Sequence, residues 1–129
     1  MKKILSILPR WIPALLIMGV IFLFSSRSSA DLPNFLSWDY AVKKMSHAVG
    51  YGLLAIAFHF AFHFSPKYRP AAWLLAILYS ATDEFHQSFV PGRHPSLTDI
   101  LVFDNIGALA ALWVHSIFGR RNEKETDAT

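Results

Sequence analysis

The stretch SATDEFHQSFVPGR carries four ionisable side chains and one amide in a chain of which only 16% is charged: Asp83, Glu84, His86, Gln87 and Arg93. Successive residues on a helix are rotated by about 100°, so Asp83, His86 and Gln87 lie on one face and Glu84 lies on its flank. Carboxylates and imidazoles on one face can act as a general acid and base, relay protons or bind a divalent metal, and Arg93 can hold an anionic group. This stretch is therefore the first candidate for a functional site.

Two further polar sets begin the second and the fourth apolar stretches of the chain. Lys44, His47 and Tyr51 recur at helical spacing and share one stripe. Asp99 and Asp104 are five residues apart, which rotates the second carboxylate by about 140° relative to the first on an α-helix. Both can face one partner only if a π-bulge intervenes or if Asp99 lies before the helix begins.

The chemistry of these sets has a metal-binding and a structural alternative. A zinc site needs three or four ligands on rigid elements, and Asp83, His86 and His47 are the side chains that could supply them. No ligand signature of high specificity is present, so we predict no metal ligand, and the sequence names no cofactor. The chain has no cysteine, which excludes thiolate sites and disulfides. The structural alternative is a satisfied polar network that holds short helices together.

The elements that position these residues are four apolar stretches separated by polar connectors. A helix of about 20 residues crosses a hydrocarbon core of roughly 30 Å. We therefore predict an all-α fold in one domain, residues 1–129: a polytopic membrane protein that is a bundle of four transmembrane helices. Gly107 is expected to give the fourth helix a smooth face on which a neighbouring helix packs closely. The predicted spans are about 5–26, 45–64, 70–89 and 99–118. No stretch is an uninterrupted apolar run of 18, so a soluble helical bundle is the alternative, although tryptophans and tyrosines near the predicted ends favour a membrane.

The distribution of lysine and arginine predicts the orientation. Eight of these residues fall in the N-terminal segment, the middle connector and the C-terminal tail, and four fall in the other two connectors. Basic residues are retained on the cytoplasmic side, so we predict a multi-pass protein of the cytoplasmic (inner) membrane with both termini and the polar tail 120–129 in the cytoplasm. The three polar sets then share the outer end of the bundle. The alternative is a cleaved secretory signal ending near Ser28, Ser29 and Ala30, which would leave three spans.

Four blocks of the sequence together resemble the VanZ-like family of small bacterial membrane proteins: FSSRSS, KMSHAVGYGLLA, DEFHQSFVPGRHPSLTD and DNIGALAA. The resemblance implies a four-span integral membrane protein and keeps the first segment as a span. It also connects the chain to an antibiotic-resistance phenotype, because the family's namesake is associated with low-level teicoplanin resistance. Two features depart from the pattern: Lys43 stands where an acid is usual, and Asp99 and Asp104 are five rather than four residues apart.

Carried over residue by residue, the resemblance and the topology select the same site residues. The candidates for acid, base or ion handling are Asp83, Glu84, His86 and His47. The candidates for substrate binding are Arg93, Gln87, Lys44, Tyr51, Ser96, Asp99 and Asp104.

The predicted function is an outward-facing polar pocket that binds or modifies a cell-envelope or lipid-linked component. The alternative is a non-enzymatic helper or partner-binding membrane protein whose polar cluster is structural. A proton-coupled transporter is less favoured because the acids gather at one side of the membrane. The expected partner is the lipid bilayer, and nucleic acid is not expected because the basic residues form no stripe.

Overall fold

The computed structural model describes residues 2–28, 34, 36–94 and 96–128, with side chains from residue 9 onward. No strand occurs in this part of the chain, and the all-α prediction is confirmed. The elements in chain order are α1 (Lys2–Ser25), the 3₁₀ helix η2 (Leu36–Trp38), α2 (Asp39–Ala61), the 3₁₀ helix η3 (Pro66–Tyr68), α3 (Arg69–Gln87), the π-helix η4 (Asp99–Asp104) and α4 (Asn105–Asp127).

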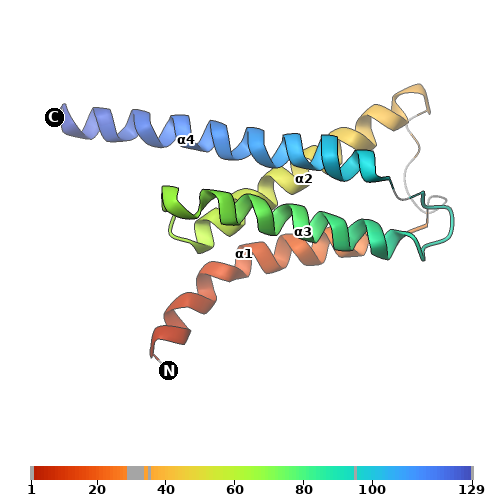
Figure 1. Ribbon diagram of the computed structural model, residues 1–129, viewed down its shortest axis with the longest axis horizontal. Helices are drawn as coiled ribbons and strands as arrows, with labels where there is room; N and C mark the ends of the chain where they lie inside the picture. Colours follow the sequence, from red (N-terminus) through yellow and green to blue (C-terminus); the bar gives the residue numbers. More distant parts are fainter. Residues whose placement is uncertain (1, 29–33, 35, 95, 129) are drawn as a thin grey trace.

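Consecutive α-helices run antiparallel to one another along the bundle (Figure 1). The beginning of α1, the turn between α2 and α3, and the end of α4 lie at one end. The end of α1, the start of α2, the end of α3 and η4 lie at the other. This arrangement brings the start of α2, the end of α3 and η4 together. The proposed signal-cleavage residues Ser29 and Ala30 lie outside the described residues.

Helix α2 is the centre of the bundle and packs against α1, α3 and α4. Its contact with α4 is close because Gly107 has no side chain: a Cβ there would lie 2.1 Å from the carbonyl oxygen of Ala48. Gly52, one turn after Ala48 on α2, makes a second close contact with α4: an added Cβ there would lie 2.9 Å from the carbonyl oxygen of Gly107. Small residues allow two helix backbones to approach in this way, so the predicted packing face of Gly107 meets α2.

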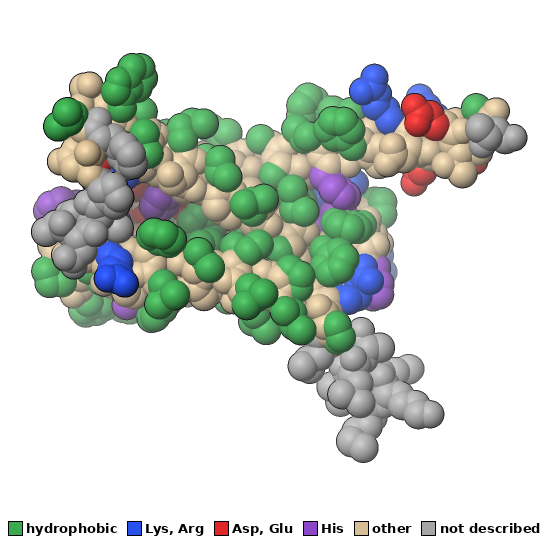
Figure 2. All heavy atoms as spheres, turned by 180° about the vertical axis from the view of Figure 1, so that it is seen from behind, with side chains coloured by type: hydrophobic (Ala, Val, Ile, Leu, Met, Phe, Trp, Pro, Cys, Tyr) green, Lys and Arg blue, Asp and Glu red, His purple; other side chains and the backbone are tan. Residues whose placement is uncertain are grey.

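The bundle is apolar on its outside and partly polar inside. Large apolar side chains are exposed on every α-helix, with Leu16 at 65%, Leu53 at 53%, Leu78 at 53% and Trp113 at 64%, and Figure 2 shows such side chains spread over the face it presents. The buried residues include Asp, Glu, Gln and Ser side chains at one end of the bundle. In an ordinary soluble protein, charged residues are mostly exposed.

Four helices are present, but one segment alone among the described residues is long and apolar enough to cross a membrane, Asp99–Asp127 through η4 and α4. The apolar part of α1 from Pro9 to Ser25 is shorter. Charged residues interrupt the other two helices, at the start of α2 and at the end of α3. The prediction of four helices is therefore confirmed, and length and composition single out the fourth as a candidate span.

Candidate functional site

The π-helix η4 aligns two acids with one stripe of α2. The Lys44 ammonium forms an ion pair with Oδ1 of Asp99. One turn further along α2, His47 Nδ1 lies 3.3 Å from Oδ1 of Asp104. A π-helix hydrogen-bonds residues five apart and so turns them towards the same side. The sequence allowed both acids to face one partner only if a π-turn lay between them or the helix began after Asp99. The π-turn is present, because Asp99 and Asp104 are the first and last residues of η4.

The next residue of the α2 stripe, Tyr51, belongs to a buried hydrogen-bond network with α1 and α3. Its hydroxyl donates to Oδ2 of Asp83 over 2.9 Å, and the hydroxyl of Ser25 donates to Oδ1 of the same carboxylate. The amide of Gln87 donates to Ser25 Oγ over 2.7 Å. All four side chains are at least 95% buried. Both oxygens of Asp83 are thus satisfied, and three helices are joined through one carboxylate.

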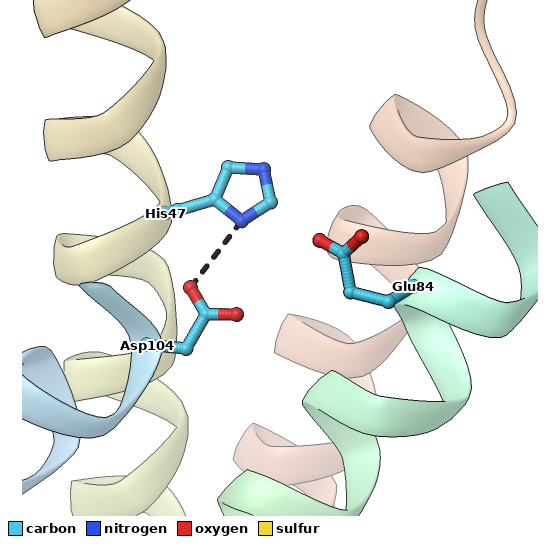
Figure 3. Close-up of side chains that lie close together, drawn as sticks. All are labelled: His47, Glu84 and Asp104. Atoms are coloured by element: carbon cyan, nitrogen blue, oxygen red, sulfur yellow. Dashed lines mark ion pairs between the residues drawn. The ribbon is translucent and has the colours of Figure 1, made fainter. Parts of the chain in front are cut away.

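A second carboxylate of α3, Glu84, faces away from this network and towards His47 and Asp104 (Figure 3). Its Oε2 accepts a hydrogen bond from the backbone N–H of Ser96 over 2.9 Å. Its Oε1 is buried and has no hydrogen-bond partner. The Asp104 carboxylate is arranged in the same way, since Oδ2 accepts from the Ser80 hydroxyl over 2.5 Å while Oδ1 makes no hydrogen bond. These three residues could hold a cation.

Histidine 86 lies outside both groups. Its Nε2 is 3.0 Å from the hydroxyl of Ser26, and its ring stacks on Phe22 with ring centroids 4.7 Å apart. The imidazole therefore faces α1, although the sequence grouped it with Asp83, Glu84 and His47. The reason is its position on α3, because Glu84 and Asp83 already occupy the directions towards α4 and α2.

Arg93 is held by the last turn of α1. Its Nη2 donates to the carbonyl oxygen of Phe24 over 2.8 Å, and its Nε donates to that of Arg27 over 2.9 Å. Carbonyls at a helix C-terminus have no partner within the helix, and a cation there also interacts favourably with the helix dipole. The turn before it is made by Gly92 with φ of 73°, a left-handed conformation that glycine adopts without strain. Arg93 thus fastens the third connector to α1.

A groove of about 450 Å³ lies between α1 and α2 and is lined by apolar and polar residues. Its apolar wall includes Val20, Ile21 and Phe24 of α1 and Val42 and Gly50 of α2, and its polar lining consists of Ser25, Lys43, Ser46, His47, Tyr51, Asp83 and Arg93. A cavity of about 510 Å³ between α3 and α4 is lined by Trp73, Trp113, Arg69 and Arg120 among others, and no acid belongs to its lining. The groove is therefore the cavity that leads to the candidate site.

The eleven predicted site residues thus fall into separate groups. Nine take part in the polar contacts around the four carboxylates, Ser96 through its backbone N–H, and His86 and Arg93 contact α1 instead. The sequence missed two hydroxyls, Ser25 and Ser80. Ser80 precedes Glu84 by one turn and so lies on the same helix face, which is the signal that could have found it. Ser25 belongs to the block FSSRSS, and the positions of its serines gave no indication that one of them would contact Asp83.

Comparison with known proteins gives one match. The model of a family described as VanZ/LLP1 matches residues 10–119, which include every predicted site residue, Ser25, Ser80 and most of each α-helix. No curated protein and no solved structure matches the chain.

Proposed function

The chain belongs to the VanZ/LLP1 family, and from the groove whose lining includes residues of the polar cluster we propose that it binds a lipid-linked component of the cell envelope within the membrane. The observation that carries this proposal is the composition of the groove. Its apolar lining residues suit an acyl or isoprenoid chain, while its hydroxyl, imidazole and charged lining groups suit a polar head.

A membrane location is proposed for all four helices. Helices α2 and α3 have 23 and 19 residues, which at 1.5 Å per residue corresponds to roughly 35 and 28 Å, close to the roughly 30 Å of a hydrocarbon core. Their charged residues are gathered at the ends or turned inwards, and their exposed sides carry Leu53 and Leu78. Ionisable residues inside a membrane face the bundle interior and mark a function.

The proposed orientation places both termini in the cytoplasm and the polar cluster towards the outer surface. The beginning of α1, the turn between α2 and α3, and the end of α4 share one end of the bundle (Figure 1), and eight of the twelve lysines and arginines belong to these segments. Basic residues are retained on the cytoplasmic side. The groove then opens near the outer leaflet, where envelope precursors are exposed.

The head of the bound molecule is proposed to be anionic. Lys43 and Arg93 both line the groove, and they bring positive charge to it. Lys43 also pairs with Asp39 at 2.8 Å, so a phosphate would compete with that carboxylate for the ammonium. Whether the bound component is also modified depends on His47 and Glu84, the acid and base candidates that remain together.

The second candidate function is a helper membrane protein whose polar cluster is structural. It is favoured by the two carboxylates that are fully engaged: Asp83 joins three helices, and Asp99 is paired with Lys44. In this case no lipid ligand would be needed. The association of the family's namesake with teicoplanin resistance makes glycopeptide susceptibility the cellular measurement for both candidates.

The test uses two glycines that have open space around them. A Cβ at Gly50 or at Gly19 would meet nothing within 4 Å, but only Gly50 lines the groove. The full chain, its Gly50→Leu variant and its Gly19→Leu variant are placed in lipid nanodiscs, and binding of a polyprenyl phosphate is measured against phosphatidylglycerol as a competitor. Gly50→Leu is expected to weaken binding at least about tenfold, which corresponds to roughly 1.4 kcal/mol, and Gly19→Leu to leave it unchanged.

Equal binding by the three proteins would contradict a ligand in the groove. Absence of binding by the unaltered protein, together with a normal effect of all three on glycopeptide susceptibility, would favour the helper.

A further inference from the structure

Three potential metal donors from three helices converge on one point at the outer end of the bundle. They are Nδ1 of His47 on α2, Oε1 of Glu84 on α3 and Oδ1 of Asp104 at the end of η4, and these atoms all lie within 4.8 Å of one another. Figure 3 shows the imidazole and the two carboxylates pointing towards each other across a small gap. The three residues belong to elements that pack directly on one another, so the backbone fixes their relative positions.

The atoms that converge are the ones without hydrogen bonds. Glu84 is 5% exposed and Asp104 is fully buried, yet Oε1 of Glu84 has no hydrogen-bond partner among the described residues. Oδ1 of Asp104 and Nδ1 of His47 lie 3.3 Å apart as an ion pair, and neither atom has a hydrogen-bond partner in the part of the chain that the structure describes. The second oxygen of each carboxylate accepts a hydrogen bond, from the N–H of Ser96 and the hydroxyl of Ser80. Metal-ligating carboxylates are oriented in this way by outer hydrogen bonds that leave one oxygen for the ion.

The charge balance of this region favours a cation. Among the described residues, no lysine or arginine forms an ion pair with Glu84 or Asp104, because the nearest one on the α2 stripe, Lys44, is paired with Asp99. Within the described part of the chain, Asp104 has only His47 as an ion-pair partner, at 3.3 Å and charged only when the imidazole is protonated, and Glu84 has none. A buried carboxylate without a partner is strongly unfavourable, and a like-charged neighbour increases the penalty. One divalent ion would balance both carboxylates while His47 binds it as a neutral imidazole.

We propose that His47, Glu84 and Asp104 form a binding site for one divalent transition-metal ion of the Zn²⁺ or Mn²⁺ type. An imidazole together with two carboxylates suits these ions, whereas Mg²⁺ and Ca²⁺ prefer oxygen ligands alone. Ligands at about 2.1 Å from one ion lie roughly 3 to 4 Å apart, so small side-chain movements complete the site. His47 is partly exposed and lines the groove, which gives the ion a path and leaves coordination positions for water or an anionic ligand. The site does not depend on the lipid.

The experiment measures bound metal directly. The full chain is purified in detergent with a tag that contains no histidine, stripped with a chelator, incubated with Zn²⁺ or Mn²⁺ at micromolar concentration and desalted before elemental analysis. The unaltered protein is expected to retain one equivalent of one of these metals. Glu84→Gln and Asp104→Asn keep the size of each side chain but remove a charged ligand. Each is expected to weaken metal binding at least about a hundredfold, because loss of a mere hydrogen-bond partner of a ligand already weakens it about 10–100-fold.

Two controls separate this site from adventitious binding. His86→Ala removes an imidazole close to Glu84 in the chain that faces α1, and His115→Ala removes one that packs against His59, with ring centroids 5.6 Å apart. Both variants are expected to retain the metal. Added metal should also raise the melting temperature of the unaltered protein and not that of Glu84→Gln, which reports binding even where a variant is less abundant.

The proposal is overturned if the unaltered protein retains neither metal, or if Glu84→Gln and Asp104→Asn retain it as well as the unaltered protein does. Loss of the metal in His115→Ala with retention in Glu84→Gln would also overturn it, because the ion would then bind at the other end of the bundle. None of these results depends on lipid binding, so a failure of this proposal is distinguishable from a failure of the proposed function.

Discussion

Replacing Gly107 with alanine is expected to loosen the contact between α2 and α4 that also carries the candidate site. The added Cβ would lie 2.1 Å from the carbonyl oxygen of Ala48 and 2.7 Å from its Cα. Carbon and oxygen atoms in close non-bonded contact are usually separated by about 3.3 Å or more, so the two backbones must move apart by roughly 1 Å. His47 precedes Ala48 and Asp104 precedes Gly107 by one turn, and the movement therefore acts on their 3.3 Å contact as well.

The expected loss of stability is the difference between two terms. Overpacking a tight contact costs typically about 1–3 kcal/mol, and here the clashing atoms belong to the backbone and cannot turn away. Replacing a helical glycine with alanine contributes about 0.5–1 kcal/mol in the opposite direction. Gly107→Ala is therefore expected to lower the free energy of unfolding by about 1–2 kcal/mol.

Gly119→Ala is the matched control on the same helix. A Cβ at Gly119 would meet nothing within 4 Å, so only the helix-propensity term remains, and a gain of up to about 1 kcal/mol is expected. Both variants can be compared with the unaltered protein by reversible unfolding in mixed detergent micelles. A Gly107→Ala variant as stable as Gly119→Ala would refute the reasoning, because it would mean that the close approach of α2 and α4 does not exist.

Two further predictions concern the buried carboxylates. Tyr51→Phe removes a hydroxyl that donates to Asp83, and it should cost about 1–3 kcal/mol because a buried charged acceptor loses a donor. Tyr79→Phe removes a hydroxyl that donates to a backbone carbonyl and should cost about 0.5–1.5 kcal/mol; equal losses in the two variants would contradict a charged acceptor. Lys44→Met leaves Asp99, which is 7% exposed, without its cation and should cost about 3–5 kcal/mol, most of which should return when Asp99→Leu is added. A double variant no more stable than Lys44→Met alone would contradict this account. Both comparisons use the same unfolding measurement.

The helices and their order could be predicted from the sequence because apolar stretches of helical length alternate with polar connectors. For the start of the fourth helix, the sequence predicted two alternatives and could not choose between them. The five-residue spacing of Asp99 and Asp104 required either a π-turn or a late helix start, and the structure has a π-helix between them. The sequence could not choose, because the choice depends on the positions of Lys44 and His47 on a different helix.

For the candidate site, too, the sequence predicted which residues share a helix face but not which helix that face contacts. The stripe of Lys44, His47 and Tyr51 followed from helical periodicity, and each of the three contacts an acid in the structure. Periodicity says which residues share a face but not which helix that face meets. For this reason His86 was grouped with the acids although it faces α1, and the sequence did not predict that the Arg93 guanidinium donates to carbonyl oxygens of Phe24 and Arg27.

A purely structural role accounts for one half of the polar cluster and not for the other. Asp83 accepts hydrogen bonds at both oxygens and Asp99 is paired with Lys44, as expected for side chains that hold helices together. Glu84 and Asp104 are equally buried, but each directs an oxygen without a hydrogen-bond partner towards the other and towards His47. A network that served only stability would not need these two groups, because replacing buried charges with apolar side chains of similar volume is often neutral or stabilising. Their arrangement is instead what a bound cation requires, and it is at these two carboxylates that the structural and the functional explanations of the cluster make different predictions.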